Sequence, residues 1–105
     1  MTRRLRVHPS AEAEVGEAAA FYDERQPGVG HDFVVAVGVA VRSALSRPRI
    51  GSPVSIGGSS LDVRRVRVRP FDYQVVYAVN DDDVLVLAVA HNKRRPLYWT
   101  DRVAE

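Results

Sequence analysis

Residues 61–91 read LDVRRVRVRPFDYQVVYAVNDDDVLVLAVAH, and this stretch decides the fold. Residues 61–69 and 71–79 alternate apolar with polar side chains, which is the pattern of half-buried β-strands. Residues 84–91 are apolar on both faces, which predicts a central strand. The polar residues 80–83 predict a hairpin turn between the last two strands. The stretch is therefore expected to form three strands of an antiparallel sheet.

Two helices are expected before these strands. Residues 11–26 carry an apolar stripe at helical spacing, directly after the capping residue Ser10. Residues 31–46 carry a second stripe, and their length favours a helix over a strand despite the many valines. The sequence Pro-Gly-Val-Gly at 27–30 predicts a turn between them. The two helices should therefore form an antiparallel hairpin.

The remaining segments complete a single domain over residues 1–105. Residues 3–8 predict a short strand, and residues 49–60, rich in Gly, Ser and Pro, predict a loop. The element order is then β-α-α-β-β-β. We expect an α+β fold in which an N-terminal strand and a two-helix hairpin pack on an antiparallel sheet of three to four strands.

The composition excludes several classes of protein. The chain has 105 residues, of which 46% are hydrophobic, enough for one packed core. It has no cysteine, which excludes a disulfide scaffold. His8, His31 and His91 lack metal-ligand spacing, so neither a metal nor another cofactor is expected. We also expect no apolar run long enough to cross a bilayer and no signal peptide, which favours a cytoplasmic protein without membrane contact.

The basic residues are clustered, although the formal net charge is only +2. Arg65, Arg67 and Arg69 alternate with valines, so three guanidinium groups should stand about 7 Å apart on one face of a strand. Such a row suits the phosphates of a nucleic acid. The alternative is an edge strand that its charges protect from aggregation.

The segment 91–99 gathers cations, aromatics and a histidine after the central strand. Lys93, Arg94 and Arg95 could hold phosphates, and Tyr98 and Trp99 could stack on bases. His91 or Tyr98 could transfer a proton. The alternatives are that both aromatic rings pack the tail against the sheet and that the histidine is a hydrogen-bonded residue at a strand end. We predict that this tail carries the target-binding function.

Several segments, in this order and spacing, resemble toxins of the RelE/ParE superfamily over nearly the whole chain. The helical hairpin matches through FYDER at 21–25, PGVG at 27–30 and Phe33. The sheet matches through VRRV at 63–66 and FDYQVVY at 71–77, and the end matches through AVAH at 88–91 and RRPLYW at 94–99. The resemblance implies the same fold and a growth-inhibiting toxin that a cognate antitoxin neutralises.

The resemblance implies two alternative activities, because RelE-type members cut messenger RNA on the ribosome without a metal whereas ParE-type members inhibit DNA gyrase. The RelE-type basic strand positions match Arg65 and Arg67, and the tail tyrosine matches Tyr98. The two RelE-type arginine positions match Gln74 and Asn92, which carry no charge. A nuclease would then depend on Tyr98 with His91 and Arg94 as catalytic residues.

This departure favours the ParE-type activity, with DNA gyrase as the target and no catalysis by the chain. A ribosome-dependent endonuclease, with ribosome and mRNA as partners, is the alternative. A third possibility is a degenerate toxin that only binds its antitoxin. The residues expected to contact the target or a nucleic acid are Arg65, Arg67, Arg69, Lys93, Arg94, Arg95 and Trp99.

Overall fold

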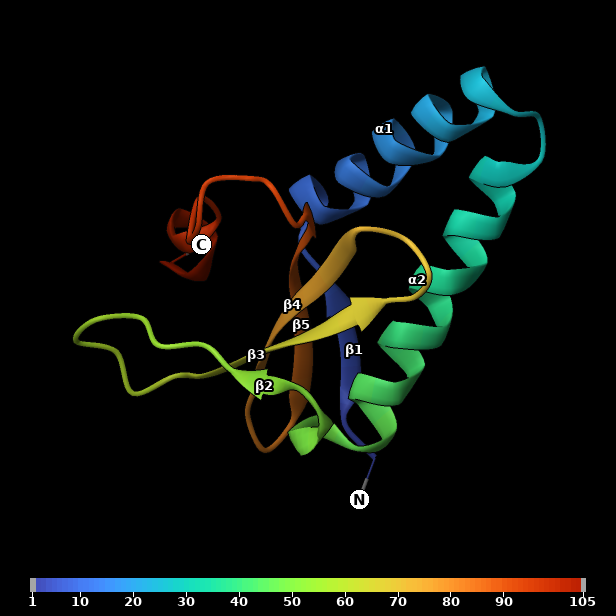
Figure 1. Cartoon of the computed structure of the whole chain (residues 1–105). Helices are drawn as coiled ribbons and strands as arrows, with labels where there is room; N and C mark the ends of the chain where they lie inside the picture. The colour runs from blue at the N-terminus through green and yellow to red at the C-terminus, as the bar shows by residue number, and fades with distance from the viewer. Residues whose placement is uncertain (1, 105) are drawn as a thin grey trace.

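The computed structural model describes residues 2–104 and has the expected element order (Figure 1). Two helices follow the first strand, and the remaining strands follow the helices. The elements are β1 (Arg4–Val7), α1 (Pro9–Arg25), α2 (Val29–Ser46), the short 3-10 helix η1 (Pro48–Ile50), β2 (Ser52–Pro53), β3 (Asp62–Val68), β4 (Tyr73–Val79), β5 (Asp83–His91) and the 3-10 helix η2 (Thr100–Ala104).

The sheet has five strands in the order β1-β5-β4-β3-β2, more than the three to four that were predicted. Strands β2 to β5 pair antiparallel, as expected. Strand β1 instead pairs parallel to β5, with Arg4 opposite Asp83 and Val7 opposite Val86. This corrects the prediction of a purely antiparallel sheet. A parallel pair needs a long crossover, and here the chain from β1 to β5 supplies one, including both helices.

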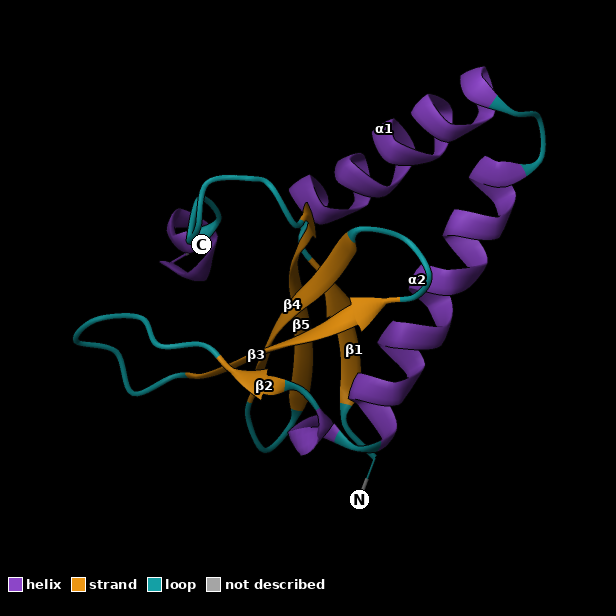
Figure 2. Cartoon of the chain, in the orientation of Figure 1, coloured by secondary structure: helices purple, strands orange, loops and turns teal. Residues whose placement is uncertain are grey.

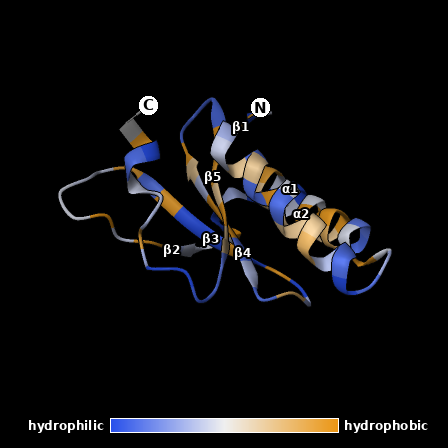
Figure 3. Ribbon diagram, turned by 90° about the horizontal axis from the view of Figure 1, so that it is seen from above, coloured by the Kyte–Doolittle hydropathy of each residue, from blue (hydrophilic) through white to orange (hydrophobic). Residues whose placement is uncertain are grey.

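The helices lie together on one side of the sheet, and the other face is covered only in part (Figure 3). Helices α1 and α2 cover one face, where Phe33, Val75 and Tyr77 are fully buried. A smaller cluster on the other face contains Leu87 and Trp99. The chain after β5 and the loop between β2 and β3 lie on that second side (Figure 2). The sheet therefore has two separate apolar contacts: the one with the helices was predicted, and the one with the tail was the alternative interpretation of Tyr98 and Trp99.

The helical hairpin differs from the prediction at its boundaries. Helix α1 begins at Pro9 rather than residue 11, because His8, and not Ser10, caps it: His8 Nδ1 accepts a hydrogen bond from the Ser10 N–H at 3.0 Å. At the turn, Asp23 Oδ1 accepts hydrogen bonds from the N–H groups of Gly28 (3.2 Å) and Gly30 (2.8 Å). These bonds satisfy donors before and in the first turn of α2.

Part of the predicted loop 49–60 is ordered against the sheet. It contains the end of η1 and the two residues of β2, which pair with Arg64 and Arg65 of β3. The buried Tyr77 hydroxyl holds this segment, since it donates to Pro48 O at 2.7 Å and accepts from Gly51 N–H at 3.1 Å. Hydrogen bonds from the Tyr77 side chain to the backbone thus hold this segment, in which only the two residues of β2 pair with β3.

Helix α2 corrects the expectation that no segment is apolar and long enough to span a membrane. Its 18 residues have a mean hydropathy of 1.3, which meets that requirement by length and composition alone. Core helices of water-soluble proteins meet it too. One side of α2 is buried in the core between the helices and the sheet. Its buried side chains include Phe33, Val37, Ala40 and Ala44. The apolar composition of α2 is therefore explained in part by its packing on the sheet.

Candidate functional site

The expected arginine row lies on the face of the sheet away from the helices. Arg65, Arg67 and Arg69 are exposed and line one hollow of about 690 Å³. Gln74 and Asn92 line the same hollow, because Arg67 of β3 is paired with Gln74 of β4 and the chain leaves β5 at Asn92. Four of the five residues that match RelE-type positions, Arg65, Arg67, Gln74 and Asn92, thus line one hollow, whereas the fifth, Tyr98, does not.

The neighbouring Arg64 has a structural role. Its side chain points to the other side of β3, is half-buried and forms an ion pair with Asp62 at 2.9 Å. Its guanidinium also donates to the carbonyl oxygens of Arg49 (3.1 Å) and Gly51 (2.9 Å). This arginine therefore ties η1 and β2 to β3.

His91 and Arg94 lie apart from the arginine row. Both line a smaller hollow of about 280 Å³ next to α1, with Glu17 and Phe21 on its helical wall. The His91 ring packs edge-on against Tyr73 at 5.1 Å, and its Nδ1 accepts the Lys93 N–H at 3.0 Å. Successive strand residues face opposite sides, so His91 faces the helices and Asn92 the arginine row. The structure therefore brings His91 together with Arg94 and separates both from the arginine row.

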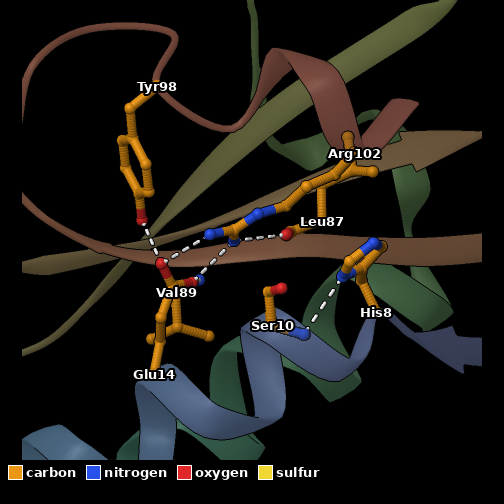
Figure 4. Close-up of polar contacts among 7 residues, drawn as sticks. All are labelled: His8, Ser10, Glu14, Leu87, Val89, Tyr98 and Arg102. Carbon is orange, nitrogen blue, oxygen red and sulfur yellow. Dashed lines mark hydrogen bonds and ion pairs between the residues drawn. The ribbon is translucent and has the colours of Figure 1, made fainter. Parts of the chain in front are cut away.

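Glu14 of α1 holds the tail through four hydrogen bonds to one carboxylate (Figure 4). The Tyr98 hydroxyl donates to Oε2 at 2.6 Å, and the Val89 N–H donates to Oε1 at 3.0 Å. Arg102 of η2 donates to both oxygens, at 2.9 and 3.1 Å, and also to Leu87 O at 2.9 Å. We call Glu14, Tyr98 and Arg102 the tail clasp, because they join α1, β5 and the C-terminal segment.

The clasp changes the acidity of its members. Burial opposes ionisation of Glu14, but the hydrogen bonds from Arg102, Tyr98 and Val89 outweigh it and lower the pKa of the carboxyl. Burial first, and then the hydrogen bond to Glu14, raise the pKa of Tyr98 far above its ordinary value. The Tyr98 hydroxyl is thus a committed donor, which disfavours the role of proton-transfer residue that was proposed for it.

The remaining tail residues divide into exposed cations and a buried ring. Lys93, Arg94 and Arg95 are exposed, and the Arg94 guanidinium stacks over the Tyr98 ring at 3.9 Å. Trp99 is only 3% exposed and packs in the second core cluster with Leu87. Its expected role in contacting a target is corrected to a packing role. Tail packing against the sheet was the alternative interpretation from the sequence.

Sequence reasoning missed both ends of the clasp. Neither Glu14 nor Arg102 was singled out as a functional residue from the sequence. The one available signal is that Glu14 lies beside Val15 at the edge of the apolar stripe of α1, where a carboxylate needs a partner. Among residues 2–104, no group of three or more His, Asp or Glu side chains could hold a metal ion.

The chain is similar to known proteins over most of its length. Residues 5–96 match the family model described as ParE toxin of the type II toxin–antitoxin system parDE. The chain is 30% identical over 97 residues to proteins named Toxin ParE2 from two Mycobacterium tuberculosis strains, CDC 1551 / Oshkosh and ATCC 25618 / H37Rv. The match covers 91% of this chain and 88% of each relative.

A solved structure described as the chromosomal ParDE TA system from P. aeruginosa has the same fold. Its TM-score is 0.72 at 15% sequence identity, and the match covers 86% of this chain and 96% of that chain. At this identity the similarity concerns the fold alone. The match to the family model over residues 5–96 covers far more than half of the chain. The chain therefore belongs to the ParE toxin family of type II toxin–antitoxin systems.

Proposed function

We propose that this toxin inhibits DNA gyrase in the cytoplasm, cleaves no RNA itself, and is neutralised by a cognate antitoxin. The observation that carries the proposal is the content of the 690 Å³ hollow, where Gln74 and Asn92 occupy the positions of the two RelE-type arginines. Membership of the ParE family supports the same conclusion.

The chemistry of metal-independent RNA cleavage explains why these two residues matter. Such a nuclease must stabilise extra negative charge on a pentavalent phosphate and must move protons. The amides of Gln74 and Asn92 donate hydrogen bonds but carry no charge. The Tyr98 hydroxyl is bound to Glu14 at 2.6 Å, and the His91 imidazole lies on the opposite side of the sheet from Asn92. Of the groups that a nuclease would need, two are thus uncharged, one is already bound to Glu14, and one lies on the other side of the sheet.

The exposed cations of the tail are the proposed contact with the target. Arg94 and Arg95 lie shortly after the central strand β5, which ends at His91. The Arg94 guanidinium stacks over the Tyr98 ring, and the clasp holds Tyr98. An arginine held in this way, next to the exposed Arg95, suits an acidic surface on a large partner.

The exposed apolar residues of the helices are the proposed contact with the antitoxin. Phe21 of α1 is 46% exposed, and Val34, Val35 and Val39 of α2 are 45% to 52% exposed. An amphipathic segment of the antitoxin could cover these side chains and remove them from water. Binding dominated by such contacts should be tight and should resist salt.

The test measures supercoiling of relaxed plasmid by purified gyrase with the full chain, beside cleavage of mRNA on translating ribosomes. We expect inhibition of supercoiling and no mRNA cleavage. Replacing Arg94 and Arg95 by glutamine should raise the toxin concentration for half-inhibition at least about tenfold, since one charge-assisted contact contributes about 1.5 kcal/mol. Arg25→Gln with Arg42→Gln removes the same charge from the helices and is the matched control.

The result against this proposal is mRNA cleavage without gyrase inhibition, which supports the ribosome-dependent nuclease instead. If the chain shows neither activity but still binds the protein encoded next to the toxin, the result supports a degenerate toxin. Adding that neighbouring protein before gyrase should abolish inhibition.

A further inference from the structure

Six arginines line two adjoining hollows beside η1, β2 and β3. Figure 2 shows how these three elements follow one another. Arg3, Arg47 and Arg49 line the first hollow, of about 480 Å³, and the Arg3 guanidinium donates to Asn80 O at 2.7 Å. The row described above lines the second, and Ile50 lines both. We call the other five arginines the arginine band: Arg47, Arg49, Arg65, Arg67 and Arg69.

No ion pair between described residues engages the arginine band. Those ion pairs engage other arginines: Arg4, Arg6, Arg64 and Arg102. Within residues 2–104, no Asp or Glu lines the second hollow. Asp62 and Asp81 line the first, but Asp62 is already paired with Arg64. The charge of the band is therefore available for an external anion, most strongly along β3.

The two parts of the band are held at a fixed distance from each other. The Arg64 guanidinium binds the carbonyl oxygens of Arg49 and Gly51, and the Tyr77 hydroxyl binds the backbone of Pro48 and Gly51. Alternate residues of a strand, such as Arg65 and Arg67 of β3, are about 7 Å apart, and Arg69 directly follows the last residue of the strand. Preorganised, repeated charge of this kind fits a polyanion with regularly spaced groups better than a single small anion.

The lining of the hollows indicates which polyanion fits. Guanidinium groups bind phosphate oxygens in a planar fork, and the amides of Gln74 and Asn92 can add phosphate contacts. No aromatic side chain lines either hollow, although single-stranded nucleic acids are usually held by stacking their bases on aromatic rings. We infer that the arginine band binds the sugar–phosphate backbone of duplex DNA, without reading its sequence.

This inference extends the proposed function, since gyrase acts on duplex DNA, but it is tested without gyrase. Fluorescence anisotropy measures the affinity of the full chain for a labelled 20-base-pair DNA duplex, the matching single strand and an RNA duplex of the same sequence. We expect the DNA duplex to bind best. With five phosphate contacts, the slope of log affinity against log salt should be about −4.5, which is about a 500-fold loss between 50 and 200 mM salt.

Two pairs of substitutions locate the site. Arg65→Gln with Arg67→Gln, and separately Arg47→Gln with Arg49→Gln, should each reduce the slope to about −2.7. The control pair Arg25→Gln with Arg42→Gln has the same net charge and should leave the slope near −4.5. Circular dichroism melting checks that each variant folds.

Three outcomes would overturn the inference. The first is no binding to the DNA duplex at 50 mM salt. The second is tighter binding to the single strand or to the RNA duplex, which would assign the band to another nucleic acid. The third is an equal loss of affinity in the control pair, which would mean that net charge and not the band causes binding. Inhibition of supercoiling by the same variants is scored separately, so failure of the gyrase proposal is distinguishable.

Discussion

Removing the Glu14 carboxylate should destabilise the protein more than any other single change to a half-buried polar side chain in the described structure. Glu14→Ala breaks four hydrogen bonds at once, from Tyr98, the Val89 N–H and both terminal nitrogens of Arg102. The Glu14 and Arg102 side chains are each only 13% exposed. The substitution therefore leaves a largely desolvated guanidinium without its carboxylate.

The expected cost follows from this geometry. Breaking a buried ion pair on one side costs about 3–5 kcal/mol, and an unpaired polar group adds to it. Arg102 keeps its bond to Leu87 O, and the remaining exposure lets water reach the site, which reduces the cost. We expect a loss of about 2–4 kcal/mol in the free energy of unfolding. For a domain of this size that corresponds to a fall in Tm of about 10–20 °C.

The assay is urea unfolding of the single variants Glu14→Ala and Arg102→Ala and of the double variant. The coupling between the two residues should be at least about 1 kcal/mol, because the first substitution already destroys most of what the second removes. Glu17 is exposed and lies about one turn further along α1. As a control, Glu17→Ala should change the free energy of unfolding by less than about 0.5 kcal/mol. The reasoning would be refuted if Glu14→Ala lowered the free energy of unfolding no more than Glu17→Ala does. It would also be refuted if the losses of the two single variants simply added up in the double variant.

Three further predictions concern stability. Gly30→Ala should lower the free energy of unfolding by about 1–3 kcal/mol, because a new Cβ would lie 2.7 Å from Asp23 Cγ. In Gly16→Ala the new Cβ meets nothing within 4 Å, so chemical denaturation should show a gain of about 0.5–1 kcal/mol. Tyr77→Phe should lose about 1–3 kcal/mol, because two buried backbone groups lose their partner; an unchanged Tm would contradict this. Because the pKa of Glu14 is lowered on folding, the ionised carboxylate stabilises the fold fully above pH 4.5. This contribution is lost as the pH falls through the folded-state pKa, so wild type and Glu14→Gln should have similar free energies of unfolding in acid.

Local pattern was sufficient for the two helices and the four longer strands. The length of 31–46, together with its apolar stripe, predicted a helix, and alternation predicted β3 and β4, because each signal depends only on neighbours along one segment. The same alternation placed Arg65 and Arg67 on one face of a strand. The order of the elements then predicted a helical hairpin packed on an antiparallel sheet, and the family resemblance supplied the matches at Gln74 and Asn92.

Pairing between distant segments was outside the reach of local pattern. Strand β1 could have paired with either edge of the sheet, and its parallel contact with β5 depends on the path that the helices impose. Likewise, the two residues of β2 are too few to show alternation, and Tyr77 rather than a pattern holds them.

The sequence was therefore enough to predict the helices, the four longer strands, the charge of the β3 row and the neutral amides at the RelE-type positions. Only the tertiary structure decided that His91 and Asn92 face opposite sides and that Trp99 is buried. It also decided that Glu14 meets Arg102, 88 residues further along the chain. The physical reason is that periodicity records which side chains share a face, whereas a buried ion pair depends on how separate elements pack, and no local signal records that contact.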